Sequence, residues 1–122
     1  MAKKILVAED DKFLGNAYRI KLTKAGFEVQ LATDGQEALT ALQTFIPDLI
    51  LLDLVMPVKD GFAALEEIKA NDKLKAIPVI VASNLGQKED TDRAMKLGAK
   101  DFVVKSDLSL DVLIQKIHTL IG

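Results

Sequence analysis

The sequence predicts a doubly wound α/β domain built on a parallel β-sheet, and three observations carry this prediction. Four short apolar runs and one segment of alternating apolar and polar residues are separated along the chain by segments whose apolar residues repeat at helical spacing. Such alternation of strand and helix favours parallel strands, right-handed crossovers and helices on both faces of the sheet. The chain has 122 residues, enough for one domain with a substantial core. Because no linker or repeat interrupts the pattern, we expect a single domain over residues 1–122.

The apolar runs predict the strands. Residues 5–8, 49–52, 79–82 and, more weakly, 102–104 are continuous apolar runs, which are typical of strands buried on both faces of a parallel sheet. Residues 27–32 instead alternate between apolar and polar side chains, which indicates a strand nearer the edge of the sheet.

Helical spacing of apolar residues predicts four helices, over residues 12–25, 62–70, 88–97 and about 109–121. Gly26 and Gly98 stand where the residue after a helix end is expected, a position that glycine favours.

A fifth helix is predicted from a capping box. Asp34 is the expected N-cap, and Glu37 lies three residues later, where its side chain can reach back toward the cap. Leu42 and Phe45 continue the apolar face of this helix, so we expect it to run until Pro47.

The composition excludes several classes of protein. Sixteen basic and eighteen acidic residues leave a net charge of -2, which gives no reason to expect a nucleic-acid surface. The absence of cysteine excludes disulfides and thiolate metal sites. The start of the chain does not resemble a secretory signal, and no apolar stretch approaches the ~20 residues that span a bilayer. We therefore expect a cytoplasmic protein with no membrane contact.

Polar side chains follow four of the five predicted strands. In open α/β sheets, ligands bind at the carboxyl ends of strands, near the point where the strand order reverses. Each residue alone has an ordinary explanation as a helix cap, a turn residue or a solvated charge. Together they would bring acids, a hydroxyl and an amine to one edge of the sheet: Glu9 and Asp10, then Asp53, then Ser83 and Asn84, then Lys105.

Asp53 is the most informative of these residues, because it interrupts the apolar segment LILLDLVMP. An unpaired buried carboxylate is costly, and neighbouring carboxylates repel, so such a site calls for a cation. Oxygen ligands without histidine or cysteine favour a hard ion, of which Mg²⁺ is the natural choice. Aspartate can form an acyl phosphate, and a lysine and a hydroxyl beside it would hold a phosphoryl group. The sequence therefore predicts that Asp53 is a phosphoryl acceptor.

Four segments, ILVAEDD, LILLDLVMPVKDG, VIVAS and DFVVK, resemble the receiver domain of two-component response regulators. The resemblance covers the chain from end to end. It implies a flavodoxin-like, five-stranded sheet in the order 2-1-3-4-5. It also implies a switch that accepts a phosphoryl group from a histidine kinase or a histidine phosphotransfer protein. The output protein, which remains unidentified, would bind the face formed by the fourth helix, the fifth strand and the fifth helix.

The resemblance assigns roles to individual residues. The phosphoryl acceptor is Asp53, and phosphoryl binding falls to Ser83 and Lys105. The conformational switch involves Ser83 and Phe102. The Mg²⁺ ligands are Asp10, Asp53, the main-chain carbonyl of Val55 and, through a water, Glu9.

The sequence departs from the family pattern at several of these positions. Ser83 stands where threonine is commoner and keeps the hydroxyl, whereas Phe102 lacks the phenol of the frequent tyrosine and can only pack. Ser106 follows Lys105 where the family usually has a cis proline. A cis bond before a residue other than proline costs ~2.5–4 kcal/mol. We therefore expect a trans Lys105–Ser106 bond if Lys105 still reaches the site.

Three positions are expected to set how long the phosphoryl group persists. In receivers that lose phosphate quickly, a polar side chain two residues after the acceptor, or two after the hydroxyl residue, helps to position the attacking water. Here these positions are Val55 and Leu85, which cannot hydrogen-bond through their side chains, and Asn84 adds bulk beside them. We therefore expect a long-lived phosphorylated form.

Rival interpretations fit the residues less well. A flavin binder of the same architecture needs a phosphate loop rich in serine, threonine and glycine, whereas EDDKF would repel phosphate. A haloacid-dehalogenase-type phosphatase needs a second aspartate where Val55 stands. A degenerate receiver that signals without phosphorylation remains the alternative, against which the complete set of acids, hydroxyl and lysine argues. We expect no turnover of an external substrate, and either a stand-alone regulator or a fragment of a longer one.

Overall fold

The strands lie parallel in the order β2-β1-β3-β4-β5, as the resemblance implied. The structure is a computed structural model that describes residues 2–84, 87–107 and 109–122. The strands of this sheet are β1 (Lys4–Ala8), β2 (Glu28–Ala32), β3 (Leu49–Leu52), β4 (Val79–Ser83) and β5 (Asp101–Val104). β2 is an edge strand, which confirms the expectation drawn from its alternating pattern.

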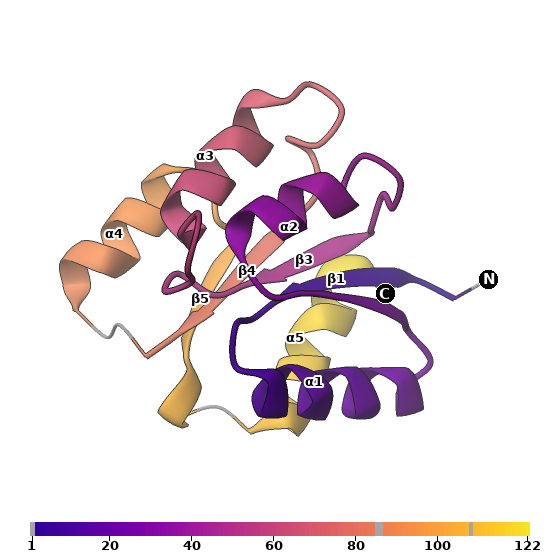
Figure 1. Cartoon of the computed structure of the whole chain (residues 1–122). Coiled ribbons are helices and arrows are strands. Elements are labelled where there is room, and N and C mark those ends of the chain that lie inside the picture. The colour runs from indigo at the N-terminus through magenta and orange to yellow at the C-terminus, as the bar shows by residue number, and fades with distance from the viewer. Residues whose placement is uncertain (1, 85–86, 108) are drawn as a thin grey trace.

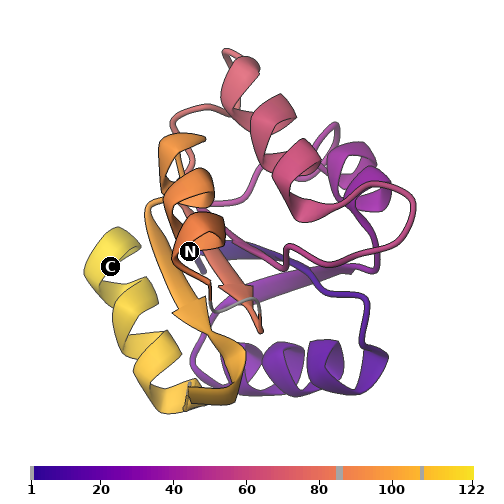
Figure 2. The ribbon, with the colours of Figure 1, turned by 90° about the vertical axis from the view of Figure 1, so that its left-hand side faces the viewer.

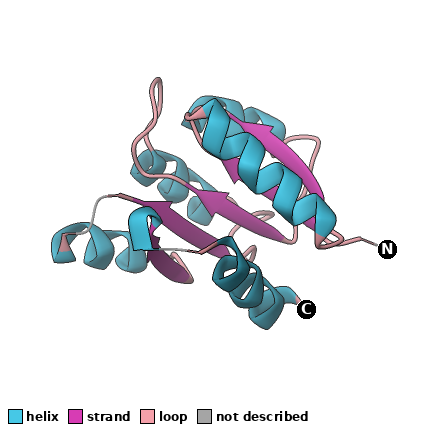
Figure 3. Cartoon of the chain, turned by 90° about the horizontal axis from the view of Figure 1, so that it is seen from below, coloured by secondary structure: helices cyan, strands magenta, loops and turns pink. Residues whose placement is uncertain are grey.

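Helices cover both faces of the sheet. They are α1 (Lys12–Lys24), α2 (Gly35–Ala41), α3 (Gly61–Ala70), α4 (Lys88–Lys96) and α5 (Leu110–Ile121), and a short 3-10 helix, η1 (Lys105–Asp107), follows β5. α2, α3 and α4 lie on one side of the sheet, and α1 and α5 lie on the other (Figure 1). The view from the side shows the same layers, and the view from below shows α1 and α5 crossing the strands (Figures 2 and 3).

Alternate residues of each central strand enter two different cores. On β1, Leu6 and Ala8 pack in the core under α2, α3 and α4, whereas Ile5 and Val7 pack in the core under α1 and α5. All four residues of β3 are buried for the same reason. Strands that bury both faces need apolar residues at every position, which explains the continuous apolar runs of the sequence.

One predicted helix is shorter than the sequence indicated. α2 ends at Ala41 rather than near Pro47, and Leu42 is its C-cap. Tighter turns follow, in which the Gln43 N–H donates to the Thr40 carbonyl and the Thr44 N–H donates to the Ala41 carbonyl, each at 3.1 Å. Leu42 is nevertheless only 3% exposed, because the turns keep its side chain against the core. The apolar pattern therefore marked a buried face correctly but not the length of the helix.

The capping residues behave largely as predicted. The Asp34 side chain accepts a hydrogen bond from the Glu37 N–H at 2.7 Å. Glu37 reaches back one residue further than expected, to the Thr33 N–H at 3.1 Å. Gly26 and Gly98 have positive φ angles of 99° and 111°, which confirms that each follows a helix end in the left-handed region.

No helix among the described residues is both long and apolar enough to cross a membrane.

Gly61 is the glycine that fixes the segment after Asp53. Its N–H donates to the Leu54 carbonyl at 2.9 Å. A Cβ atom at this position would lie 2.1 Å from the Asp53 carbonyl oxygen and 2.6 Å from the Leu54 Cα atom. Only glycine lets α3 begin this close to the main chain of Asp53.

We predict that Gly61→Ala lowers the free energy of unfolding by about 2–3 kcal/mol, since the main chain around Asp53 must move to admit the methyl group. Gly26→Ala is the matched control. Its φ is 99° but nothing lies within 4 Å of the added atom, so only the backbone strain of about 1 kcal/mol is expected. Urea denaturation of both variants tests this, and equal losses in the two would contradict the close-approach argument.

Candidate functional site

The register of the sheet brings Glu9 and Asp53 to the same level. β1 pairs with β3 so that Ala8 lies opposite Leu52, and each acid is the next residue along its strand. The Asp53 N–H donates to the Ala8 carbonyl at 3.0 Å, and the Glu9 N–H donates to the Ala32 carbonyl at 2.9 Å. The main chain therefore holds both acids at the carboxyl edge of the sheet, where the sequence predicted a site.

Lys105 joins the two carboxylates. Its Nζ atom lies 2.8 Å from Asp53 Oδ2 and also forms an ion pair with Glu9 Oε1. The Lys105 side chain is 12% exposed, and those of Glu9 and Asp53 are 2% and 6% exposed. A single ammonium group thus neutralises part of the charge of two buried acids, as buried carboxylates require.

Asp10 completes an acidic cluster at the exposed side of the site. Oxygen atoms of Glu9, Asp10 and Asp53 lie within 4.8 Å of one another. Three carboxylates with one lysine leave an excess of negative charge. The oxygen-only donor set and this charge fit a hard divalent cation such as Mg²⁺.

Asp11 has a structural role beside this cluster. Its side chain caps α1 by accepting hydrogen bonds from the Phe13 N–H at 2.9 Å and the Leu14 N–H at 3.1 Å. Its own N–H donates to Glu9 Oε2 at 3.1 Å. The start of α1 therefore fixes the orientation of the Glu9 carboxylate.

A pocket of about 390 Å³ opens over these side chains. Of the predicted site residues that the structure describes, only Phe102 is missing from its lining, which consists of Glu9, Asp10, Asp11, Asp53, Val55, Ser83, Asn84 and Lys105. Ser83 is fully buried at the end of β4, whereas Val55 is 56% exposed. The Val55 N–H donates to Asp53 Oδ1 at 3.3 Å.

Phe102 lies apart from the pocket lining. Phe102 is half-buried and packs against the core under α2, α3 and α4. Leu85 lies outside the described residues. The expected trans bond between Lys105 and Ser106 is confirmed, because the described residues contain no cis peptide bond. Lys105 still reaches Asp53.

Burial dominates the electrostatics of Glu9. It raises the pKa of Glu9 to about 7, and the negative charge of Asp53 acts in the same direction, while Lys105 and the Asp11 N–H oppose it. Burial alone would lower the pKa of Lys105, but its hydrogen bonds to Asp53 and Glu9 raise that pKa above the usual value. The lysine therefore stays charged, and Glu9 can exchange a proton near neutral pH in the absence of a metal.

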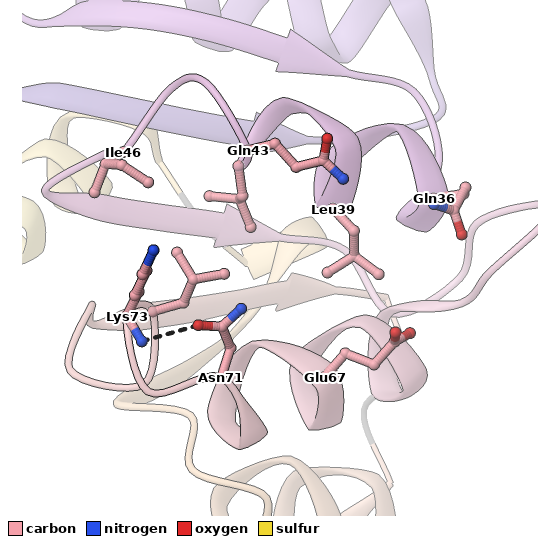
Figure 4. A pocket seen from close by; sticks show the side chains of 9 residues that line it. Gln36, Leu39, Gln43, Ile46, Glu67, Asn71 and Lys73 are labelled. Carbon is pink, nitrogen blue, oxygen red and sulfur yellow. Dashed lines mark hydrogen bonds between the residues drawn. The ribbon is translucent and has the colours of Figure 1, made fainter.

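A second pocket, of about 640 Å³, lies between α2 and α3 and contains none of the predicted site residues. Figure 4 shows side chains of α2 and the chain after it facing those at the end of α3. Its apolar lining residues are Leu39, Leu42, Ile46 and Leu74, and its polar lining includes three carboxamides and the charged Glu67 and Lys73. Among the described residues it has no cluster of acids in its lining, whereas the acids and Lys105 lie together in the smaller pocket.

Sequence reasoning did not identify the pairing of Lys105 with Glu9, nor the proximity of Tyr18 to these charges. Burial raises the pKa of Tyr18, and the charges of Lys105, Glu9 and Asp53 all act on its phenol. In the sequence, Tyr18 falls on the apolar face of a helix, a pattern that indicates only a core residue.

Comparisons with known proteins agree with the geometry. A family model described as the response regulator receiver domain matches residues 5–118. The chemotaxis protein CheY of Thermotoga maritima is 39% identical over 106 residues, which cover 86% of this chain and 87% of that protein.

Two solved structures are also similar to this chain. The phosphorylated cyanobacterial phytochrome response regulator RcpA has a TM-score of 0.85 at 34% identity and covers 98% of this chain and 91% of its own. The Mn²⁺-bound form of response regulator Rcp1 has a TM-score of 0.85 at 33% identity, with 96% and 92% covered. The chain spans 42% or less of the length of several other curated relatives, which are transcriptional and motility regulators.

The raised pKa of Glu9 predicts how the free energy of unfolding depends on pH when a chelator keeps the protein free of metal. The folded state holds the Glu9 proton up to about pH 7, whereas the unfolded chain releases it near 4.5. The wild type should therefore lose stability relative to Glu9→Gln as the pH rises from 4.5 to 7. The loss should be no more than about 3 kcal/mol. Chemical denaturation of both proteins across this range measures the difference, and a difference that does not vary with pH would refute the argument.

Proposed function

The chain belongs to the response regulator receiver domain family, and we propose that it is a signalling switch that accepts a phosphoryl group on Asp53. The observation that carries this proposal is the ion-paired arrangement of Asp53, Lys105 and Glu9 at the mouth of the acidic pocket. Of the three clustered acids, Asp53 directly follows the central strand β3, whereas Glu9 and Asp10 follow β1. The degenerate alternative is not favoured, because every side chain that phosphoryl transfer requires is present in one place.

Asp53 is suited to nucleophilic attack. Its Oδ2 atom is held by Lys105 at 2.8 Å and its Oδ1 atom by the Val55 N–H at 3.3 Å, so the carboxylate is oriented before a donor arrives. Phosphoryl transfer needs mainly positioning and neutralisation of charge. An Asp53 oxygen would form the new bond to phosphorus as the bond from phosphorus to the donor breaks.

A divalent cation, which we propose to be Mg²⁺, fits the acidic cluster. Glu9, Asp10 and Asp53 would hold it, with the Val55 carbonyl as a further ligand from the family pattern. When bound, it would neutralise the carboxylates and attract the oxygen atoms of the incoming phosphoryl group. The related response regulator Rcp1 has a Mn²⁺-bound form, which supports a divalent cation as the ion of this family.

The donor is proposed to be a phosphohistidine of a histidine kinase or a histidine phosphotransfer protein. The phosphorus–nitrogen bond of the donor would break, the imidazole would leave as the base, and Asp53 would become an acyl phosphate. His118, the only histidine, is exposed late in α5 and packs against Phe27, which precedes β2 at the opposite edge of the sheet, so we assign it no part in the transfer.

The protein would act as a stoichiometric acceptor and not as an enzyme with an external substrate. Ser83 and Lys105 are proposed to hold the transferred group, and Phe102 to report it to an output protein at the face formed by α4, β5 and α5. A cytoplasmic location, as in the sequence-based expectation, completes the proposal.

We predict that acetyl phosphate with Mg²⁺ adds one phosphate to the protein, which intact-mass analysis would detect. Asp53→Asn and excess chelator should each abolish the label, because the first removes the nucleophile and the second removes the cation. Asp72→Asn is the matched control, since Asp72 is an exposed acid whose side chain is 93% accessible, and it should be labelled normally. Labelling that persists in Asp53→Asn would place the acceptor elsewhere.

Val55 is exposed beside Asp53, and we expect its apolar side chain to prolong the lifetime of the phosphorylated form. Val55 lines the pocket beside Asn84 and has no side-chain group to orient a water, and such groups typically contribute ~10²-fold or more to rate. Val55→Asn should therefore accelerate the loss of phosphate after the donor is removed. Val55→Leu, which is equally apolar, is the control, and Leu85→Glu tests the second predicted position. Decay at the wild-type rate in both polar variants would mean that water positioning does not limit the lifetime.

A further inference from the structure

Tyr18 lies at the end of the core that α1 and α5 form with the sheet. It is only 3% exposed and belongs to the same cluster as Val7 of β1 and Val103 of β5. The other buried residues of this cluster have no polar side-chain atom, so the Tyr18 hydroxyl is the only side-chain hydroxyl in the cluster. Buried tyrosines usually find a polar partner for this group.

The strands place the charged pair directly beyond the tyrosine. Side chains alternate between the faces of a sheet, so Glu9, which directly follows β1, continues the side of Val7, and Lys105 begins η1 directly after β5. These two residues form an ion pair, which shows that both side chains converge there. The apolar layer beneath α1 and α5, to which Tyr18 belongs, therefore ends in the Glu9–Lys105 pair.

The direction of α1 favours a position of the phenol close to this pair, whose charges act on the Tyr18 side chain. Gly15, Tyr18 and Leu22 are the buried residues of α1. A Cβ atom at Gly15 would lie 3.9 Å from Glu9 Cγ, so this turn of the helix passes against the Glu9 side chain. Long side chains in a helix lean toward its N-terminus, over the preceding turn. Because Gly15 has no side chain, that turn leaves room for the Tyr18 ring.

The hydroxyl of Tyr18 is accessible to solvent. No hydrogen bond joins it to another residue in the described part of the chain. No buried side-chain oxygen or nitrogen among those residues lacks a partner, so the hydroxyl is not sealed in the core. A water that bridges two polar groups acts nearly as well as a direct hydrogen bond.

We propose that Tyr18 is a positioning residue, whose hydroxyl is linked through a water to the Glu9–Lys105 pair and keeps the Lys105 ammonium directed at the pocket. An ammonium group has three N–H donors, and the two carboxylates engage two of them. When Asp53 accepts a phosphoryl group, Lys105 loses the free Asp53 carboxylate as a partner. The water-linked hydroxyl of Tyr18, which is uncharged, would then hold the lysine in place. This inference rests on the proposed function of the pocket.

Tyr18→Phe tests the proposal, because it removes the hydroxyl and keeps the ring. With acetyl phosphate and Mg²⁺ as the probe, we expect phosphorylation of Asp53 to become about three- to tenfold slower, the effect of losing one hydrogen bond. In a Lys105→Met background the same substitution should have no further effect, since Tyr18 acts through the lysine. Equal slowing in both backgrounds, or no slowing in either, would overturn the proposal.

Phe27→Leu is the matched control for packing. Phe27 is 5% exposed in the same core cluster and carries no hydroxyl, so this variant should lower the melting temperature without selectively slowing phosphorylation. A control that slows labelling as much as Tyr18→Phe would show that Tyr18 only packs.

A second readout does not depend on phosphorylation. In NMR spectra of isotope-labelled protein, the Nζ resonance of Lys105, assigned by its loss in Lys105→Met, should shift in Tyr18→Phe. An unchanged resonance would overturn the link between Tyr18 and Lys105. If the unsubstituted protein takes up no phosphate, the proposed function fails, and this resonance still decides the role of Tyr18.

Discussion

The ammonium group of Lys105 holds two buried carboxylates that come from different strands, and the carboxyl edge of the sheet is organised around this contact. Glu9 and Asp53 are each less than one-tenth exposed, so neither could carry a charge there without a partner. The lysine reaches them because β5 ends at Val104 and the chain turns into η1 at Lys105 itself. With one ammonium group and three carboxyl groups, the cluster is compensated only in part, which leaves it open to a cation.

The main chain supports this contact from several sides. Asp53 follows β3 and donates its N–H to β1, and the Asp11 N–H orients the Glu9 carboxylate from the start of α1. Gly61 lets α3 begin directly against the main chain of Asp53. Groups held in this way need little rearrangement when a phosphoryl group arrives, which is the main requirement of phosphoryl transfer.

The cores on the two faces of the sheet contact different residues of the same site. The core under α2, α3 and α4 contains Phe102 at its margin, beside the elements expected to carry the output. The core under α1 and α5 ends at Glu9 and Lys105, beside Tyr18. A change of charge at Asp53 can therefore act on both layers, because the strand that carries it is buried between them.

The sequence by itself determined the order of strands and helices, the buried runs and the identity of the polar residues at the strand ends, because each of these depends on local periodicity and residue type. Residues 49–52 are all apolar, so their side chains can all be buried only if helices cover both faces of the strand. Gly26 and Gly98 were recognisable as the residues after helix ends from the neighbouring sequence alone. The length of α2 was not predictable in this way, since Leu42 and Phe45 keep their apolar spacing in turns that bury them equally well.

Only the tertiary structure decided which partners the polar side chains take. Lys105 lies 52 residues after Asp53 and 96 after Glu9, and no local pattern indicates that one ammonium bridges both. Tyr18 likewise looks like an ordinary core residue until the strand register places Glu9 and Lys105 beyond its ring. Pairing between side chains from distant elements depends on the register and the direction of those elements, and these are set when the whole sheet assembles.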